Sequence, residues 1–282
     1  FGANGFRQIA QHNPYIMKHG DKMIPAEVFK SGGTQGFPTP TFITEKDLEL
    51  ESKALGTRCF APGGFNKNDK LYNTYNPAHK GGREIQKAGL TIGMEVITKR
   101  PEDDTKNVIK MLKAYQINSI AIVQPPITED DTTQKGAGVT FLNLFKEAHD
   151  LFGKEGQIKK AFITGYKIPE SVITLAESIK LDLFTTYGCS EFIPLSTSTC
   201  EQKPKKKCNF NDQHLLWGPH FVLVVKQEEN QLVPVKKREK GIALVTTVGI
   251  NSGRTIYLNY ALGDTAILRE EKCECGRTTP II

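Results

Sequence analysis

The sequence has no apolar run long enough to span a membrane, no low-complexity tract and no internal repeat. Its opening segment, FGANGF, lacks the basic flank and the apolar middle of a signal peptide. We therefore expect a cytoplasmic protein with no membrane partner. The first residue is phenylalanine rather than methionine, which indicates a fragment of a longer chain.

Six cysteines in 282 residues are too few for a disulfide scaffold. With 38% hydrophobic and 24% charged residues, the composition is that of an ordinary globular protein. The formal net charge is +6, but no aromatic residues interleave the basic runs at 203–207 and 235–240, and no nucleic-acid-binding motif is present. We expect no nucleic-acid partner, and the positive charge favours an anionic small molecule.

Strands and helices alternate in the middle of the chain. The predicted strands are DKLYNTY, EVITK, SIAIV, KKAFIT and LDLFTTYG, and the predicted helices between them are GGREIQKAGLTIG, DTKNVIKMLKAYQ, VTFLNLFKEAHDLFG and PESVITLAESI. Such alternation predicts parallel βαβ units, in which ligands bind at the carboxyl ends of the strands.

The pattern changes after Glu191. The segments HFVLVVKQ, IALVTTVG and TIYLNY predict strands without intervening helices, which is typical of an antiparallel, β-rich lobe. We therefore assign residues 1–194 to an α/β portion that carries a glycine-rich loop, and residues 195–282 to the β-rich lobe, with both parts belonging to one core.

The glycine-rich loop lies in the segment FKSGGTQGFPTPTFIT. Residues 31–36 hold three glycines, two hydroxyl side chains and an amide. Backbone N–H groups in such a turn form a nest for oxyanions, so the loop suits a phosphate chain. It is not a Walker loop, because no Gly-Lys-Ser/Thr follows. A hairpin connection would also favour glycine.

Two further segments carry groups suited to a nucleotide. TTYGCSEF places Tyr187 and Glu191 at the end of a predicted parallel strand, where an aromatic ring can stack on a base and a carboxylate can hold Mg²⁺. NYALGDTAIL places Asp264 after a glycine, where a carboxylate can accept hydrogen bonds from ribose; taken alone, this segment predicts a turn.

In this order, and with the ending CECGRTTP, these segments resemble the adenylate-forming (ANL) superfamily and its phenylacetate-CoA ligase-like branch. That branch carries Ser-Ser-Gly-Thr-Thr-Gly-x-Pro-Thr, Tyr-Gly-x-Ser-Glu, Arg-Tyr-x-x-Gly-Asp and Cys-x-Cys-Gly-Arg-Thr. The resemblance covers roughly residues 28–282. It implies an α/β fold, with the parallel βαβ layers of an adenylate-forming N-terminal core and a smaller antiparallel lobe, and without the family's small C-terminal domain.

The resemblance also implies a site for ATP and Mg²⁺. Thr34 and Glu191 are the implied catalytic residues, and Glu191 serves the magnesium ion. The residues implied in nucleotide binding are Ser31, Gly32, Gly33, Thr34, Gln35, Gly36, Gly165, Tyr166, Tyr187, Gly188, Ser190 and Asp264.

Four positions depart from the family pattern. Gly32 and Gln35 replace hydroxyl residues of the loop, and Asn259 replaces the arginine before Tyr260. Lys167 stands where the family often has glutamate beside the adenine. Because the backbone N–H donors of the loop remain, we still expect nucleotide binding. These departures leave open the rate of the reaction and the identity of the substrate.

The cysteines predict a structural zinc site. Cys273 and Cys275 resemble half of a zinc knuckle. Cys200, Cys208, His214 and His220 are candidates for the other half, and four ligands are expected among Cys200, Cys208, His214, Cys273 and Cys275. A shell of four cysteines, or three and a histidine, leaves no open position, so the role is structural. Reduced cysteines in surface turns are the alternative.

The resemblance implies ATP-dependent activation of a small carboxylic acid as an acyl adenylate, followed by transfer to coenzyme A or another thiol acceptor in the full-length protein. Without the family's C-terminal domain and its lysine, we expect an incomplete enzyme that binds ATP and adenylates feebly. The alternative is a catalytically weakened nucleotide-binding or assembly protein on the same scaffold; a basic nucleic-acid binder is a third class. Which acid is activated stays open, and so does the oligomeric state, for which a dimer is plausible.

Overall fold

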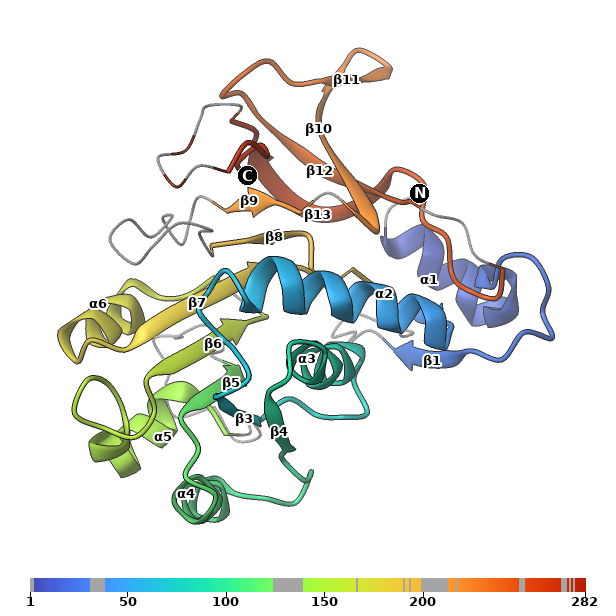
Figure 1. Ribbon diagram of the computed structural model, residues 1–282. Helices are drawn as coiled ribbons and strands as arrows, with labels where there is room; N and C mark the ends of the chain where they lie inside the picture. Colours follow the sequence, from blue (N-terminus) through green and yellow to red (C-terminus); the bar gives the residue numbers. More distant parts are fainter. Residues whose placement is uncertain are drawn as a thin grey trace.

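The computed structural model describes residues 3–30, 39–123, 139–165, 167–189, 191–192, 194–198, 213–216, 218–248, 252–269, 273, 275 and 277–282. Within these residues the strands form sheets of seven, four and two strands (Figure 1). The predicted α/β class is confirmed, with one mainly parallel sheet and separate antiparallel sheets. No helix in this part of the chain is both long enough and apolar enough to cross a bilayer.

The N-terminal region forms a hairpin and a long helix. Its elements are α1 (Ala3–His12), η1 (Pro14–Met17), β1 (Glu27–Lys30), β2 (Pro40–Ile43), α2 (Glu45–Leu55) and the π-helical turn η2 (Gly56–Phe60). β1 and β2 pair antiparallel, with Lys30 opposite Pro40. The glycine-rich loop therefore does connect a hairpin. Residues 31–38 lie outside the described residues, so their phosphate-binding role stays a prediction.

The larger sheet combines five parallel strands with two short antiparallel ones. Its strands are β3 (Lys70–Asn73), β4 (Glu95–Thr98), β5 (Ser119–Val123), β6 (Lys160–Thr164), β7 (Asp182–Tyr187), β8 (Ser196–Thr197) and β9 (His214–Leu215). The crossover elements are α3 (Lys80–Thr91), α4 (Thr105–Ala114), α5 (Phe141–Ala148), η3 (His149–Leu151) and α6 (Glu170–Ser178). The strand order is β4-β3-β5-β6-β7-β8-β9. The predicted alternation of strands and helices is confirmed.

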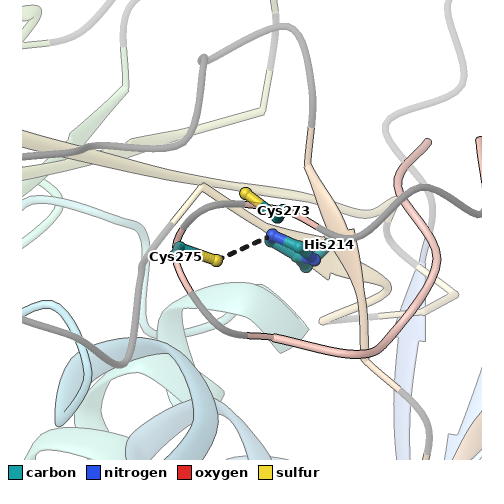
Figure 2. Close-up of side chains that lie close together, drawn as sticks. All are labelled: His214, Cys273 and Cys275. Carbon is teal, nitrogen blue, oxygen red and sulfur yellow. Dashed lines mark hydrogen bonds between the residues drawn. The ribbon is translucent and has the colours of Figure 1, made fainter.

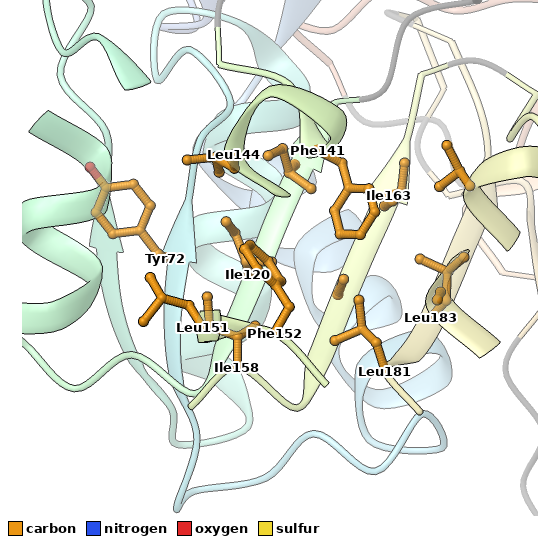
Figure 3. Close-up of a cluster of buried hydrophobic side chains, with 14 of the residues drawn as sticks. Tyr72, Ile120, Phe141, Leu144, Leu151, Phe152, Ile158, Ile163, Leu181 and Leu183 are labelled. Atoms are coloured by element: carbon orange, nitrogen blue, oxygen red, sulfur yellow. The ribbon is translucent and has the colours of Figure 1, made fainter. Parts of the chain in front are cut away.

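Both faces of the larger sheet are buried, because successive side chains of its central strands point to opposite sides. On one face, Ile120 and Ile163 belong to an apolar cluster with Phe141 of α5 (Figure 3). On the other face, Phe162 belongs to a second cluster with Leu55 of α2. Helices thus pack on both apolar faces of the sheet, and the strand ends are the places where polar groups can gather.

The β-rich lobe is a four-stranded antiparallel sheet. Its strands are β10 (His220–Glu228), β11 (Gln231–Pro234), β12 (Lys240–Thr247) and β13 (Tyr260–Ile267), in the order β11-β10-β12-β13. β8 and β9 follow the predicted boundary at residue 195 but pair with the larger sheet. The four-stranded sheet therefore begins at His220, and the division into two portions stays a prediction.

The predicted strand TIYLNY is wrong, because β13 begins only at Tyr260. Asn259 adopts a φ of 46°, which breaks the extended backbone. The residues before it bond instead to threonine side chains of β12, with the N–H groups of Tyr257 and Asn259 donating to Thr247 Oγ1 (3.1 Å) and Thr246 Oγ1 (3.0 Å).

Asp264 lies within β13 and not in the predicted turn. Ile242 pairs with Thr265 and Leu244 with Ala261, so three residues of β13 bulge opposite a single residue of β12. Gly263 has a φ of 91° within this bulge, a conformation that glycine adopts without strain. Bulges redirect side chains beside functional sites, and this one sends Asp264 toward the larger sheet.

Candidate functional site

The carboxyl ends of β5, β6 and β7 are adjacent in the larger sheet, where ligands bind in folds of this kind. Tyr75 connects two of these ends, because its hydroxyl donates to the Thr164 carbonyl (2.8 Å), accepts from the Thr164 N–H (3.0 Å) and lies 3.1 Å from the Ile122 carbonyl. Burial raises the pKa of Tyr75 well above its usual value. Tyr75 therefore holds the carboxyl ends of β5 and β6 together.

Tyr187 and Asp264 come from different sheets and contact each other. The Tyr187 hydroxyl, at the end of β7, donates to Asp264 Oδ2 at 2.6 Å. Burial raises the pKa of Tyr187, and the hydrogen bond to Asp264 raises it further. The phenol therefore keeps its proton at neutral pH. The structure thus brings together the residues predicted to bind adenine and ribose, and their contact with a nucleotide stays a prediction.

Glu191 is buried in a turn directly after β7. The turn is closed by two backbone hydrogen bonds, from the Cys189 N–H to the Phe192 carbonyl (2.9 Å) and from the Phe192 N–H to the Cys189 carbonyl (3.1 Å). Glu191 Oε1 accepts from the Tyr260 hydroxyl at 3.3 Å. Burial, followed by the proximity of Glu191, raises the pKa of the Cys189 thiol. The turn places a carboxylate, the ligand type that Mg²⁺ prefers, beside the strand end.

The other predicted nucleotide residues are placed only in part. Gly165 directly follows β6 and has a φ of 106°, a conformation that favours glycine, and Gly188 follows β7. The predicted residues that lie outside the described residues are Ser31, Gly32, Gly33, Thr34, Gln35, Gly36, Tyr166, Ser190, Cys200 and Cys208.

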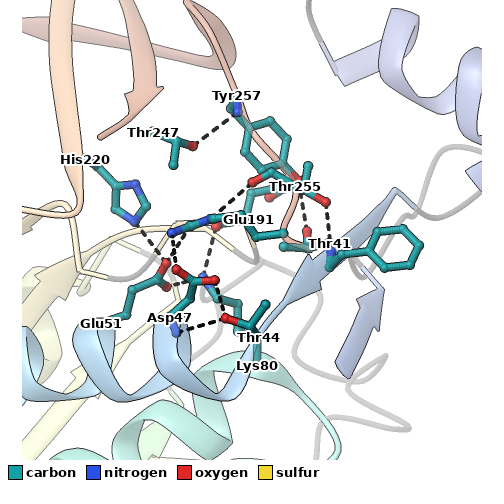
Figure 4. A network of polar contacts seen from close by, with 12 residues as sticks. Thr41, Thr44, Asp47, Glu51, Lys80, Glu191, His220, Thr247, Thr255 and Tyr257 are labelled. Atoms are coloured by element: carbon teal, nitrogen blue, oxygen red, sulfur yellow. Dashed lines mark hydrogen bonds and ion pairs between the residues drawn. The ribbon is translucent and has the colours of Figure 1, made fainter. Parts of the chain in front are cut away.

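A buried cluster of charged side chains lies next to Glu191, between two helices and the β-rich lobe (Figure 4). Its members are Asp47 and Glu51 of α2, Lys80 and Glu84 of α3, His220 of β10, and Arg254. This cluster was not predicted from the sequence. A signal was available, because Asp47 and Glu51 are spaced i, i+4 and share a helix face with the core residue Leu48.

Glu51 is the centre of this charged cluster. Arg254 bridges Asp47 Oδ1 and Glu51 Oε1, both at 3.0 Å. Lys80 Nζ lies 2.6 Å from Glu51 Oε2 and 3.3 Å from Glu84 Oε1. Burial alone would raise the pKa of Glu51, but Lys80 and the other neighbouring groups lower it to about 2. Burial raises the pKa of Glu84 well above its usual value. Glu51 is thus ionised at neutral pH.

His220, one of the zinc-ligand candidates from the sequence, belongs to this cluster. Its Nε2 lies 3.7 Å from Glu51 Oε1, and its ring meets the Phe192 ring edge-on at a centroid distance of 4.9 Å. Burial lowers the pKa of His220 to about 4, although Glu51 opposes this shift. His220 is therefore neutral at pH 7 and resists protonation in the folded state.

The lowered pKa of His220 predicts that the protein loses stability in mild acid. Its folded pKa of about 4 lies below the unfolded value of 6.5, so the unfolded state binds more protons between these values. Stability therefore falls as pH falls from 6.5 toward 4, by on the order of 2 kcal/mol between pH 7 and pH 5. Glu84, whose pKa is raised, acts in the opposite sense. Comparison of wild type with His220→Gln isolates the histidine.

The measurement is urea unfolding at pH 7 and pH 5. The wild type should lose more stability across this interval than His220→Gln. His149→Gln, which removes an exposed histidine, should behave like wild type. An equal loss in wild type and His220→Gln would contradict the assignment.

The second candidate site is a group of three metal-ligating side chains (Figure 2). His214 of β9, Cys273 and Cys275 offer ligand atoms that all lie within 4.8 Å of one another, with Cys275 Sγ 3.2 Å from His214 Nε2. His214 Nδ1 lies 3.1 Å from the Thr279 carbonyl. A zinc-binding histidine commonly donates its other N–H to such a carbonyl, which leaves Nε2 for the metal. The three residues therefore fit zinc, with a fourth ligand to be supplied.

Neither a protein-family model nor a curated protein matches the sequence. Solved structures share the fold. A 2-hydroxyisobutyryl-CoA ligase in complex with 2-HIB-AMP and CoA superposes with a TM-score of 0.75 at 12% identity, over 99% of this chain and 57% of that one. The O-succinylbenzoate CoA synthetase of Bacillus subtilis, with ATP and magnesium, gives a TM-score of 0.61 at 14% identity, over 90% of this chain and 48% of that one. An N-terminal subdomain of Klebsiella oxytoca NpsA, with 3-hydroxybenzoyl-AMSN, gives 0.58 at 12% identity, over 90% and 62%.

These neighbours are adenylate-forming enzymes, and the chain has the fold of their N-terminal core. It spans a little over half the length of the 2-hydroxyisobutyryl-CoA ligase. At these identities the likeness defines the fold alone.

Proposed function

We propose that this chain is the nucleotide-binding core of an adenylate-forming ligase that activates a carboxylic acid with ATP. The observation that carries the proposal is the contact of Tyr187 with Asp264. The two residues are 77 positions apart and lie on different sheets, yet the resemblance assigns both to one nucleotide. Their meeting at the carboxyl end of β7, with Glu191 in the following turn, supports a nucleotide site there.

In this proposal, Tyr187 stacks on the adenine and orients Asp264, whose Oδ1 accepts from the ribose hydroxyls. The backbone N–H groups of residues 31–36 hold the phosphates. Glu191 would bind Mg²⁺, which would neutralise phosphate charge.

The proposed reaction has two steps. A carboxylate oxygen of the acid attacks the α-phosphorus, the bond to pyrophosphate breaks, and an acyl adenylate forms. In the longer protein, the sulfur of coenzyme A or another thiol then attacks the acyl carbon, and AMP leaves.

Two substitutions should impair the reaction by different routes. Glu191→Gln removes the charge that steadies the metal, and should lower the rate of pyrophosphate release about a hundredfold. Asp264→Ala removes charge-assisted hydrogen bonds to ribose worth about 1.5–3 kcal/mol, and should weaken ATP binding about tenfold or more. Calorimetry gives the affinity, and pyrophosphate release with a panel of acids gives the rate. Glu147→Gln, on the exposed face of α5, is the control. Unchanged kinetics in both site variants of an active preparation would refute the proposal.

A catalytically weakened nucleotide-binding protein is the second candidate. The observation that favours it is Asn259, which stands where the family has arginine and pairs with Thr246, whose Oγ1 lies 3.2 Å from Asn259 Oδ1. A neutral side chain tied to β12 supplies no cation for the phosphates. ATP binding without pyrophosphate release from any acid would favour this candidate.

Finer assignments extend the proposal. The Cys-x-Cys-Gly-Arg-Thr segment at 273–278 supports the phenylacetate-CoA ligase-like branch, and the His214–Cys273–Cys275 group supports structural zinc, with Cys200 or Cys208 as the fourth ligand. A small organic acid and coenzyme A are the proposed substrates. A cytoplasmic location suits an enzyme of these substrates with free thiols at Cys59 and Cys189.

A further inference from the structure

Lys80 makes contacts that join three separate parts of the chain. Its side chain is 1% exposed, and its Nζ contacts Glu51 Oε2 of α2 at 2.6 Å and Glu84 Oε1 of α3 at 3.3 Å. The third contact is the backbone carbonyl of Glu191, at 3.0 Å. An ammonium group has three N–H donors. One of them donates to the Glu191 carbonyl and so holds the turn after β7, while the Glu51 and Glu84 carboxyl groups lie within ion-pair distance of the ammonium.

Glu191 is therefore held at two points. Lys80 holds its carbonyl oxygen from the side of the helices, and the Tyr260 hydroxyl contacts its carboxylate Oε1 at 3.3 Å from the side of the β-rich lobe. Both anchoring groups are buried, at 1% and 2% exposure. Because Glu191 is held at both its main chain and its side chain, the orientation of its carboxylate is fixed.

The need to balance the charge of Glu51 does not explain why Lys80 contacts Glu191. Arg254 already pairs with Glu51 and with Asp47. Arg254 otherwise bonds to the neighbouring Thr255 carbonyl, within the part of the chain that the structure describes. The two buried cations thus share the anion Glu51, while the Lys80 ammonium also reaches the turn that carries Glu191.

We propose that Lys80 and Tyr260 are positioning residues that direct the Glu191 carboxylate toward the metal ion of the bound nucleotide. This inference rests on the proposed function, in which Glu191 binds Mg²⁺. Neither residue touches the reacting atoms, and both act through Glu191. Groups that orient a metal ligand in this way commonly change metal affinity by about 10–100-fold when they are removed.

The test compares ATP binding with and without Mg²⁺. Calorimetry gives the Kd for ATP in EDTA and in saturating Mg²⁺, and the ratio of the two measures the contribution of the metal. In Lys80→Met this ratio should fall about tenfold relative to wild type. Tyr260→Phe, which keeps the ring and loses only the hydroxyl, should lower it by a smaller factor. A purely structural role would weaken binding equally in both buffers and leave the ratio unchanged.

Arg254→Met is the matched control, because it removes the other buried cation from Glu51 and leaves the Lys80 contact to Glu191 in place. It should lower stability and keep the ratio. Unchanged ratios in Lys80→Met and Tyr260→Phe overturn the inference, and if Lys80→Met does not fold, Tyr260→Phe decides. A ratio of one in wild type, or one unaffected by Glu191→Gln, refutes the proposed role of Glu191 itself. A ratio that depends on Glu191 and not on Lys80 or Tyr260 refutes only the positioning role.

Discussion

Replacing Glu51 by glutamine is expected to lower the free energy of unfolding by about 3–5 kcal/mol, because it removes the buried anion that Lys80 and Arg254 share. Glu51 is fully buried and pairs with both Lys80 and Arg254. A glutamine oxygen can accept one hydrogen bond, but it carries no charge to balance these two cations. Because folded domains are stable by only about 5–15 kcal/mol, this single substitution should remove a large part of the total. Urea unfolding at pH 7 is the measurement.

Glu45→Gln provides the matched control for this prediction. Glu45 also lies on α2 and pairs with Lys87 of α3, so both substitutions remove an ion pair between the same two helices. The Glu45 side chain is 58% exposed and that of Lys87 is 26% exposed, so water screens this pair. Its loss should cost less than about 1 kcal/mol. Similar losses in the two variants would show that burial does not set the strength of the Glu51 contacts.

The parallel sheet could be predicted from the sequence because its information is local. Segments such as SIAIV and KKAFIT are short and apolar, and each is followed by a segment with helical spacing. Burial on both faces then follows from the alternation of side chains along the strands, as Phe162 and Ile163 show on β6. The start of β13 could not be predicted in this way. TIYLNY has the composition of a strand, but threonine side chains of β12 and the left-handed conformation of Asn259 prevent extension before Tyr260.

The candidate site depends on contacts between distant residues, which spacing along the chain does not reveal. The resemblance assigned Tyr187 and Asp264 to one nucleotide, and the structure adds their direct hydrogen bond and the bulge that produces it. The charged cluster was missed because its members come from α2, α3 and the β-rich lobe. Only Asp47 and Glu51 carry a local signal, their i, i+4 spacing on the helix face of Leu48, and the other members appear in the sequence as ordinary polar residues. Only their arrangement in space shows that the charges of Asp47 and Glu51 compensate those of Lys80 and Arg254.

The purified chain is expected to contain about one zinc ion, bound by His214, Cys273 and Cys275 with one further ligand. Removing a structural zinc costs on the order of 10 kcal/mol in small zinc-binding peptides. Here we expect chelation or Cys273→Ser to release the metal and to loosen the segments it joins, which are β9 and residues 273–282. Elemental analysis measures the zinc content, and hydrogen exchange of these segments measures their opening.

Cys189→Ala is the control for zinc binding, because Cys189 lies in the turn beside Glu191 and is not one of the three grouped ligands. This variant should keep its zinc and its protection from exchange in β9. The reason to expect a structural metal is the geometry around His214, whose Nδ1 faces the Thr279 carbonyl while Nε2 faces Cys275. A histidine oriented from both sides presents a fixed ligand, and zinc would then connect the end of the larger sheet to the last residues of the β-rich lobe. Protein prepared without chelator that contains no metal would refute this assignment, and the short contact between His214 and Cys275 would then be a hydrogen bond between a reduced thiol and an imidazole.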